Sequence, residues 1–144
     1  EIAAEILLAA RKRLTSEGPN NLALRAVARD VGMVSSAVYR YFASRDALLT
    51  ALLVEGYNGL GSAVEEADAS VSERTDVLER WMRACRAIRA WARAHPGDYA
   101  LLYGSPVPGY AAPQDTITPA ARGSEEGCSA STQLARVAGS GECD

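Results

Sequence analysis

A cluster of hydrogen-bonding side chains occupies positions 35 to 41 of the 144-residue sequence. On a helix, the outward residues of this stretch supply hydroxyls, phenols and a guanidinium but no carboxylate: Ser35, Ser36, Tyr39, Arg40 and Tyr41. Such groups hydrogen-bond to phosphate oxygens and base edges, whereas DNA would repel a carboxylate. Ala37 is small enough for close approach to a groove, and its methyl group can meet that of thymine. These residue types indicate a helix that contacts DNA.

The residues around this cluster have the spacing of a helix-turn-helix. Ala28 falls where two helices would cross closely, and Gly32 falls where the first helix must end in a turn with positive φ. Val38 supplies the apolar contact from the second helix back to the first. The rest of the buried side recurs at helical intervals, at Val27, Val31 and Met33. A plain helical hairpin would share this spacing, but its second helix would bury most of its surface or expose Glu and Lys.

Apolar periodicity predicts helices along the chain, and no strand is evident. A first helix starts near Ile2 and ends at the turn-rich stretch 16–21. The hairpin helices are expected over 24–31 and 35–42. Ser44 is the predicted N-cap of the next helix, which is long and apolar on one face.

A polar break at 67–72 is expected to separate this helix from a second long helix that ends near Ala94. Pro96 is predicted to break that helix, a short helix to resume over 98–103, and an extended Pro/Gly loop to follow. Five arginines between positions 80 and 93 lie largely off the apolar stripe. We interpret them, Arg80 included, as a solvated face rather than a second nucleic-acid surface.

Charge is distributed unevenly along the chain. The whole sequence has a net charge of −3. Residues 1–55 contain seven Arg and Lys against six Asp and Glu, a net of +1, and the remainder contains eight against twelve, a net of −4. An N-terminal part that is more basic than the rest suits a protein that binds DNA at one end.

Neither enzymatic nor metal chemistry is supported. His95 is the only histidine, so no Ser-His-Asp or Cys-His set can be assembled. Cys85, Cys128 and Cys143 lack the short spacing of metal ligands, so we expect no metal and no cofactor. Cys85 is expected in the core. We expect the other two cysteines to be free thiols, which is typical of a protein in the reducing cytoplasm. We expect no membrane span and no signal peptide.

Residues 2–57 resemble the N-terminal domain of the tetracycline-repressor (TetR) family of transcription regulators. The resemblance rests on three motifs with the family's spacing, LRAVARDVG from Leu24, AVYRYF from Ala37 and SRDALL from Ser44. It implies a homodimer that binds double-stranded DNA at a near-palindromic operator. The dimer would dissociate from this operator when a small ligand enters the C-terminal domain.

The resemblance also assigns roles to individual residues. The positions that face DNA in the family correspond to Ser35, Ser36, Ala37, Tyr39 and Tyr41. Arg25 and Arg45 stand at the starts of two helices, where relatives touch phosphate. With Arg40, these residues form the predicted DNA-binding set.

We therefore expect an all-α chain in two parts. A helix-turn-helix DNA-binding domain spans 1–46, and a helical regulatory domain for ligand binding and dimerisation spans 47–122. The polar tail 123–144 departs from the two long helices that the family has there. A truncated chain, a tail from another reading frame and missing internal segments all remain open as explanations.

Aromatic and apolar side chains of the second part predict a pocket for a small hydrophobic ligand. The candidate residues are Trp81, Met82, Cys85, Trp91, Tyr99 and Tyr103. Because pockets and cores use the same residue types, the alternative that these side chains are simply core stays open.

The sequence thus predicts a cytoplasmic, bacterial transcription repressor without enzymatic activity, associated with the nucleoid when bound to DNA and released from its operator by a ligand. The alternative is a helical protein-interaction module that uses the same hairpin without DNA. The outer face of Ser, Tyr and Arg between positions 35 and 41 counts against that alternative.

Overall fold

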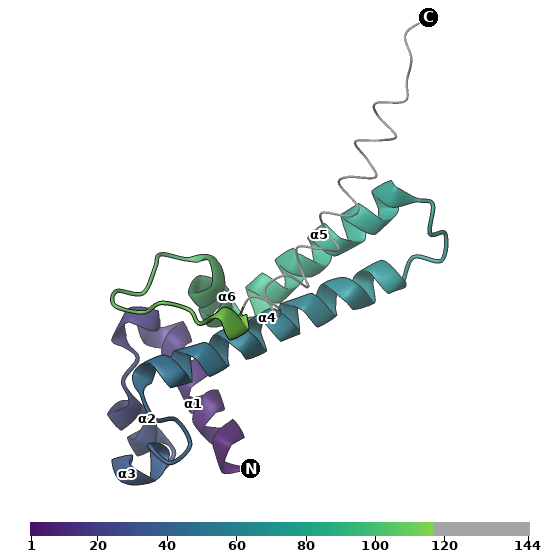
Figure 1. The fold of residues 1–144 in the computed structure, drawn as a ribbon. Coiled ribbons are helices and arrows are strands. Elements are labelled where there is room, and N and C mark those ends of the chain that lie inside the picture. The colour runs from purple at the N-terminus through teal and green to yellow at the C-terminus, as the bar shows by residue number, and fades with distance from the viewer. Residues whose placement is uncertain (117–144) are drawn as a thin grey trace, which may run out of the picture.

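The computed structural model describes residues 1–116, which are helical and contain no strand within that range. The elements are α1 (Ile2–Glu17), η1 (Pro19–Asn21), α2 (Leu24–Asp30), α3 (Ser35–Val38), α4 (Arg45–Ala69), α5 (Val77–Ala94), α6 (Pro96–Tyr103) and η2 (Gln114–Thr116). In Figure 1, helices α1 to α3 form a head at one end of α4, and α4 and α5 run side by side as a long antiparallel hairpin. The predicted all-α class is confirmed. The predicted tail 123–144 lies outside the described residues.

The turn between α2 and α3 has the geometry that its sequence predicts. Gly32 has a φ of 68° and lies just beyond the end of α2. Its N–H donates to Arg29 O at 3.2 Å, and the N–H of Met33 donates to Ala28 O at 2.9 Å. These two bonds form a Schellman motif, in which a residue with positive φ ends the helix. Ala28 and Val38 are 1% and 0% exposed, so the predicted helix contact is confirmed.

Helix α3 is shorter than the predicted 35–42. It ends at Val38 and continues as a turn, in which Arg40 N–H donates to Ala37 O at 3.2 Å and Tyr41 N–H donates to Val38 O at 3.0 Å. Bonds to the third preceding residue wind the backbone more tightly than an α-helix, although Val38 O also accepts an α-helical bond from the N–H of Phe42 at 3.0 Å. This tight winding leads the chain into the N-cap of α4, where Ser44 Oγ accepts from the N–H of Ala47 at 3.0 Å, as predicted.

The head and the first half of α4 share one apolar core. Its fully buried side chains come from α1, α2, α3 and α4, and include Ile6, Val27, Val38, Leu49 and Leu52. Because α3 contributes a single buried side chain, Val38, its position depends on the other three helices. The core therefore fixes a helix that is too short to be stable alone.

Helix α4 is also long and apolar enough to cross a membrane by length and composition, with a mean hydropathy of 1.2, although we expected no such run. Its buried residues pack instead against the other helices, Leu48 and Leu52 in the head core and Leu60 and Val64 against α5. This is the arrangement of a central core helix.

Helix α6 begins at Pro96, two residues before the predicted start, because proline needs no N–H partner in the first helical turn. The next residue, Gly97, is buried against the end of α1. A Cβ atom at Gly97 would lie 2.6 Å from Thr15 Oγ1 and 2.8 Å from Thr15 N. Only a glycine permits this close approach of α6 to the backbone of α1.

We predict that Gly97→Ala destabilises the protein by about 1–3 kcal/mol, because the added methyl group forces α6 away from α1. Gly59→Ala, within α4, is the matched control. Its added Cβ would lie 3.4 Å from Trp91 Nε1 of α5, which is an ordinary van der Waals contact. Helix propensity then makes the control neutral or up to about 1 kcal/mol stabilising. Urea denaturation measures both changes. Equal stability of Gly97→Ala and the original chain would show that the helices do not approach so closely.

Candidate nucleic-acid interface

Helix α3 and the turn after it present the predicted DNA-facing side chains at the surface. Ser36, Tyr39, Arg40 and Tyr41 are exposed, and Ser35 and Ala37 are half-buried. The side chains of Tyr39 and Tyr41 are 46% and 45% exposed, although both are large and partly apolar. In Figure 1, α3 lies on the head, far from the turn that joins α4 to α5. The surface is thus open to a partner.

Helix α2, which supports α3, is held to α1 by an ion pair. Arg13 Nε and Nη2 donate to the two carboxylate oxygens of Asp30 at 2.5 and 2.9 Å, and Arg13 Nη1 donates to Glu17 at 2.7 Å. The hydrogen bonds from Arg13 lower the pKa of the Asp30 carboxyl. Both oxygens are engaged by a planar guanidinium, so the pair also fixes the relative direction of the two helices. Arg13 and Asp30 are 17 positions apart, so no local sequence pattern indicates that they pair.

The side chain of Arg45, a predicted phosphate contact, donates hydrogen bonds to backbone carbonyl oxygens of the protein. Its Nε donates to Leu22 O at 2.9 Å, and its Nη2 donates to Pro19 O at 3.1 Å and to Asn20 O at 3.2 Å. These carbonyls belong to the η1 turn and the residue after it. Arg45 therefore joins the start of α4 to the turn that precedes α2, a role that its position in the sequence did not reveal.

Arg25 has a different environment, because its side chain is exposed and makes no hydrogen bond within residues 1–116. It shares a surface hollow of about 460 Å³ with Tyr39, Ser44 and Arg45, beside Leu24 at the start of α2. The structure thus gathers two predicted phosphate contacts and one predicted DNA-facing tyrosine around a single space. Two guanidinium groups and a phenol are suitable donors for a phosphate.

The structure does not bring all six residues of the predicted ligand pocket together. Trp91 lines a hollow of about 350 Å³ between α4, α5 and α6 that contains none of the other five. Tyr99 and Tyr103 lie on α6, where their ring centroids are 5.2 Å apart and Tyr103 also meets Tyr57 of α4 edge-on. The remaining three residues lie on α5 and do not line the hollow beside Trp91: Trp81, Met82 and Cys85.

The hollow beside Trp91 is charged. Arg11 of α1 donates to Glu55 of α4 at 2.6 Å and to Asp98 of α6 at 3.2 Å, and Asp98 is only 6% exposed. All three residues line the hollow with Trp91. One arginine of the head is thereby bonded to two helices of the rest of the chain.

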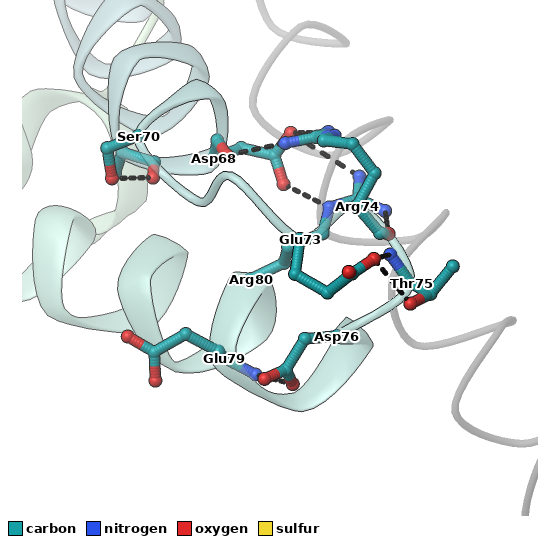
Figure 2. Close-up of polar contacts among 9 residues, drawn as sticks. Asp68, Ser70, Glu73, Arg74, Thr75, Asp76, Glu79 and Arg80 are labelled. Carbon is teal, nitrogen blue, oxygen red and sulfur yellow. Dashed lines mark hydrogen bonds and ion pairs between the residues drawn. The ribbon is translucent and has the colours of Figure 1, made fainter.

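A second cluster joins α4 to α5 at the far end of the hairpin, as Figure 2 shows. Asp68 accepts from Arg80 Nε at 2.7 Å and also from Arg74. Arg80 is 8% exposed, so the prediction that it belongs to a solvated face is wrong. A guanidinium is buried here because a carboxylate near the end of α4 meets the first turn of α5. Hydrogen bonds from Arg80 lower the pKa of Asp68.

We predict that Asp68→Asn lowers the free energy of unfolding by about 2–3 kcal/mol at neutral pH, because it removes the carboxylate that accepts two hydrogen bonds from the buried Arg80. The pKa of Asp68 is lowered in the folded protein, so its contribution is full at neutral pH and is lost as the pH falls through that lowered pKa.

Urea denaturation at neutral and acidic pH therefore should show the two proteins converging in acid. Glu79→Gln is the control, because it breaks an exposed pair with Arg83 and should change stability by less than about 1 kcal/mol. A stability difference that grows in acid would contradict the assignment.

Comparison with known proteins places this geometry in a family. Residues 6–52 match the family described as "Bacterial regulatory proteins, tetR family", and residues 81–136 match "Tetracyclin repressor-like, C-terminal domain". The first match contains α2, α3 and the Schellman turn, and the second starts within α5.

Individual relatives agree with the family matches. Over 118 residues the chain is 50% identical to the HTH-type transcriptional regulator Rv1816 of Mycobacterium tuberculosis, covering 80% of this chain and 49% of the relative. A solved structure of SCO4313, described as a regulatory protein, has 36% identity and a TM-score of 0.74 over 85% of this chain and 57% of that one. PfmR, a TetR family transcriptional regulator from Thermus thermophilus, shares the fold at 21% identity, with a TM-score of 0.75 over 96% and 75% of the two chains.

A helix-turn-helix head on a long helical hairpin, with matches to both family domains, defines a protein of the tetracycline-repressor class. The chain belongs to the TetR family. It spans about half the length of the curated relatives it matches, and those relatives are named HTH-type transcriptional regulators.

Proposed function

We propose that this chain is a sequence-specific DNA-binding transcription regulator that inserts α3 into the major groove. The observation that carries the proposal is the exposed surface of α3 and the following turn, which offers hydroxyl, phenol and guanidinium groups without a carboxylate. The Schellman turn and the head core hold this surface in place. In this proposal, residues 1–46 form the DNA-binding domain and residues 47–122 the regulatory domain.

The residues of the surface divide by the part of DNA they would contact. Ser36 and Ala37 are small and lie on α3 itself, so they allow the helix to come close to base edges. Arg25, Tyr39 and Arg45 line the surface hollow at the start of α2 and would bind the phosphate backbone. Phosphate contacts set affinity and register, whereas the α3 contacts would select the sequence.

The proposal also includes the assembly that this geometry would serve. Two copies of the chain would form a homodimer, place two α3 helices about one DNA turn (roughly 34–36 Å) apart and bind a near-palindromic operator. A small hydrophobic ligand would release the repressor by favouring another arrangement of the two heads. The protein would act in the bacterial cytoplasm, at the nucleoid when bound to DNA. The match to the C-terminal family domain supports this part.

We predict that Arg25→Ala weakens binding to all duplexes about equally and lowers the salt slope of binding by about one, because a phosphate contact carries no base information. Arg86→Ala is the matched control, since it removes the same charge from α5, away from the head. Fluorescence anisotropy with random and operator duplexes at several salt concentrations measures both. Equal effects of the two substitutions would exclude a specific role for Arg25.

We predict that Ala37→Glu abolishes operator preference, because it brings an uncompensated negative charge to a base edge. Ala90→Glu, at an exposed position of α5, adds the same charge away from the head and should leave binding nearly unchanged. Circular dichroism checks that both variants keep their helicity. A folded Ala37→Glu variant with unaltered operator affinity would contradict the placement of α3. Salt-independent or absent DNA binding by the original chain would favour a protein-interaction module instead.

A further inference from the structure

The outward face of α5 carries three arginines that have no partner among residues 1–116. Arg86, Arg89 and Arg93 are exposed, and none of them forms a hydrogen bond or an ion pair with another residue of that range. The other two arginines of this helix each pair with a carboxylate. The three partnerless arginines therefore form a cationic face that the described part of the chain leaves uncovered.

The guanidinium groups of this face repel one another. Arg86 precedes Arg89 by three residues, and Arg89 precedes Arg93 by four, which are the spacings at which side chains meet on a helix surface. No Asp or Glu of α5 lies three or four positions from any of the three. Because like charges at these spacings destabilise a helix, an anionic group placed over this face would stabilise α5.

The chain beyond Thr116 carries the complementary charge. Residues 117–144 contain four acidic residues and two arginines, a net of −2. Two of these acids are adjacent, Glu125 and Glu126, and Cys128 follows two positions later. A carboxylate is the group that a guanidinium binds most strongly, through two parallel hydrogen bonds. Two neighbouring carboxylates thus suit two neighbouring arginines.

The position of Thr116 brings this segment within reach of α5. Thr116 is buried and lines a hollow together with Tyr57 of α4. Two residues further along α4, Gly59 lies against Trp91 in the last turn of α5. The nine residues from Thr116 to Glu125 can span at most about 30 Å. The chain therefore leaves the described part beside the C-terminal end of α5 and is long enough to cross to its outward face.

We propose that residues 124–128 of this chain dock on the outward face of α5, with the two adjacent acids against Arg89 and Arg93. The segment runs toward the start of α5, so that it meets Arg93 with Glu125 and then Arg89 with Glu126. Surface ion pairs are individually weak, but the segment is tethered to the same chain, which gives it a high effective concentration at this face.

The alignment also brings two thiols together. Cys85 is a half-buried free cysteine one helical turn, about 6 Å, before Arg89. Cys128 lies two residues beyond Glu126, which is about 7 Å in an extended chain. When Glu126 binds Arg89, Cys128 therefore lies beside Cys85.

Docking has a consequence for DNA binding. DNA binds cationic surfaces regardless of its sequence, and an uncovered row of arginines is such a surface. A segment that neutralises α5 leaves the head as the cationic surface available to DNA. The docking itself does not depend on the proposed function, because it concerns two parts of the same chain.

Disulfide trapping tests the alignment in the full chain with its native cysteines. Diamide oxidises two thiols in contact to a disulfide, and peptide mass spectrometry without reduction identifies the pair. Cys128 and Cys143 lie 43 and 58 positions from Cys85, so chain length alone favours Cys128 by less than about twofold. We expect the bond from Cys85 to Cys128 to form at least about fivefold faster. A ratio of about two or less would overturn the proposal.

Charge reversal tests the proposed ion pairs. Arg89→Glu combined with Arg93→Glu should slow trapping of Cys128 by Cys85 at least about fivefold, and adding Glu125→Arg and Glu126→Arg should restore the rate. Arg83→Glu is the control, because it reverses a charge of α5 that belongs to an exposed pair elsewhere on the helix. Circular dichroism checks helicity. Unchanged trapping in the reversed variant, or no recovery in the exchanged one, would overturn the pairing.

A measurement without cross-linking keeps the proposal testable if a variant does not fold. A nitroxide spin label on Cys128, in a chain with Cys85→Ser and Cys143→Ser, should broaden the amide NMR signals of residues 85–93. The amide of Leu8, exposed on α1, should stay sharp. Unbroadened α5 signals would overturn the proposal. Broadening that occurs only between labelled and unlabelled molecules would assign the face to a second copy and would also overturn it.

Discussion

The contact of α6 with α1 is the constraint on which the arrangement of the molecule depends. Gly97 lets the two backbones approach, and the next residue, Asp98, accepts a hydrogen bond from Arg11 of α1. Arg11 also reaches Glu55 of α4, so one guanidinium bonds to both α4 and α6. The head is consequently attached to the rest of the chain through α6 as well as through the continuous helix α4. A displacement in α5 or α6 can therefore reach the head by either connection.

The head shows how a very short helix can be placed accurately. Helix α3 has four residues and only Val38 is buried, so its own hydrogen bonds cannot define it. The Schellman turn sets its start, the tight turn after Val38 sets its end, and α1, α2 and α4 form the surface on which it packs. Its remaining side chains are then available for a partner.

Local features of this fold were predictable from the sequence, and contacts between distant residues were not. Gly32, Ala28 and Ser44 each have a local signature, because positive φ, close helix crossing and N-capping restrict the residue type. The pair of Asp68 with Arg80 depends on the geometry of the α4–α5 turn, which a helical periodicity does not contain. The arginine pattern alone therefore misplaced Arg80 on the solvated face. Arg45 was predicted to lie at a helix start, but its bonds to the η1 turn come from tertiary packing.

The predicted ligand residues show the same limit. Their types suit an apolar site, but sequence periodicity does not show which helix faces meet, and the structure distributes them over α5 and α6.

The most direct measurement of the central claim is a backbone amide NMR titration of the chain with duplex DNA. If α3 reads DNA, the shifts should be confined to the hollow around Arg25, to residues 35–41 and to the start of α4. The arginines of α5 that lie away from the head, such as Arg86 and Arg89, should keep their signals unchanged. Shifts centred on α5, or none on residues 35–41 when DNA is bound, would contradict the account.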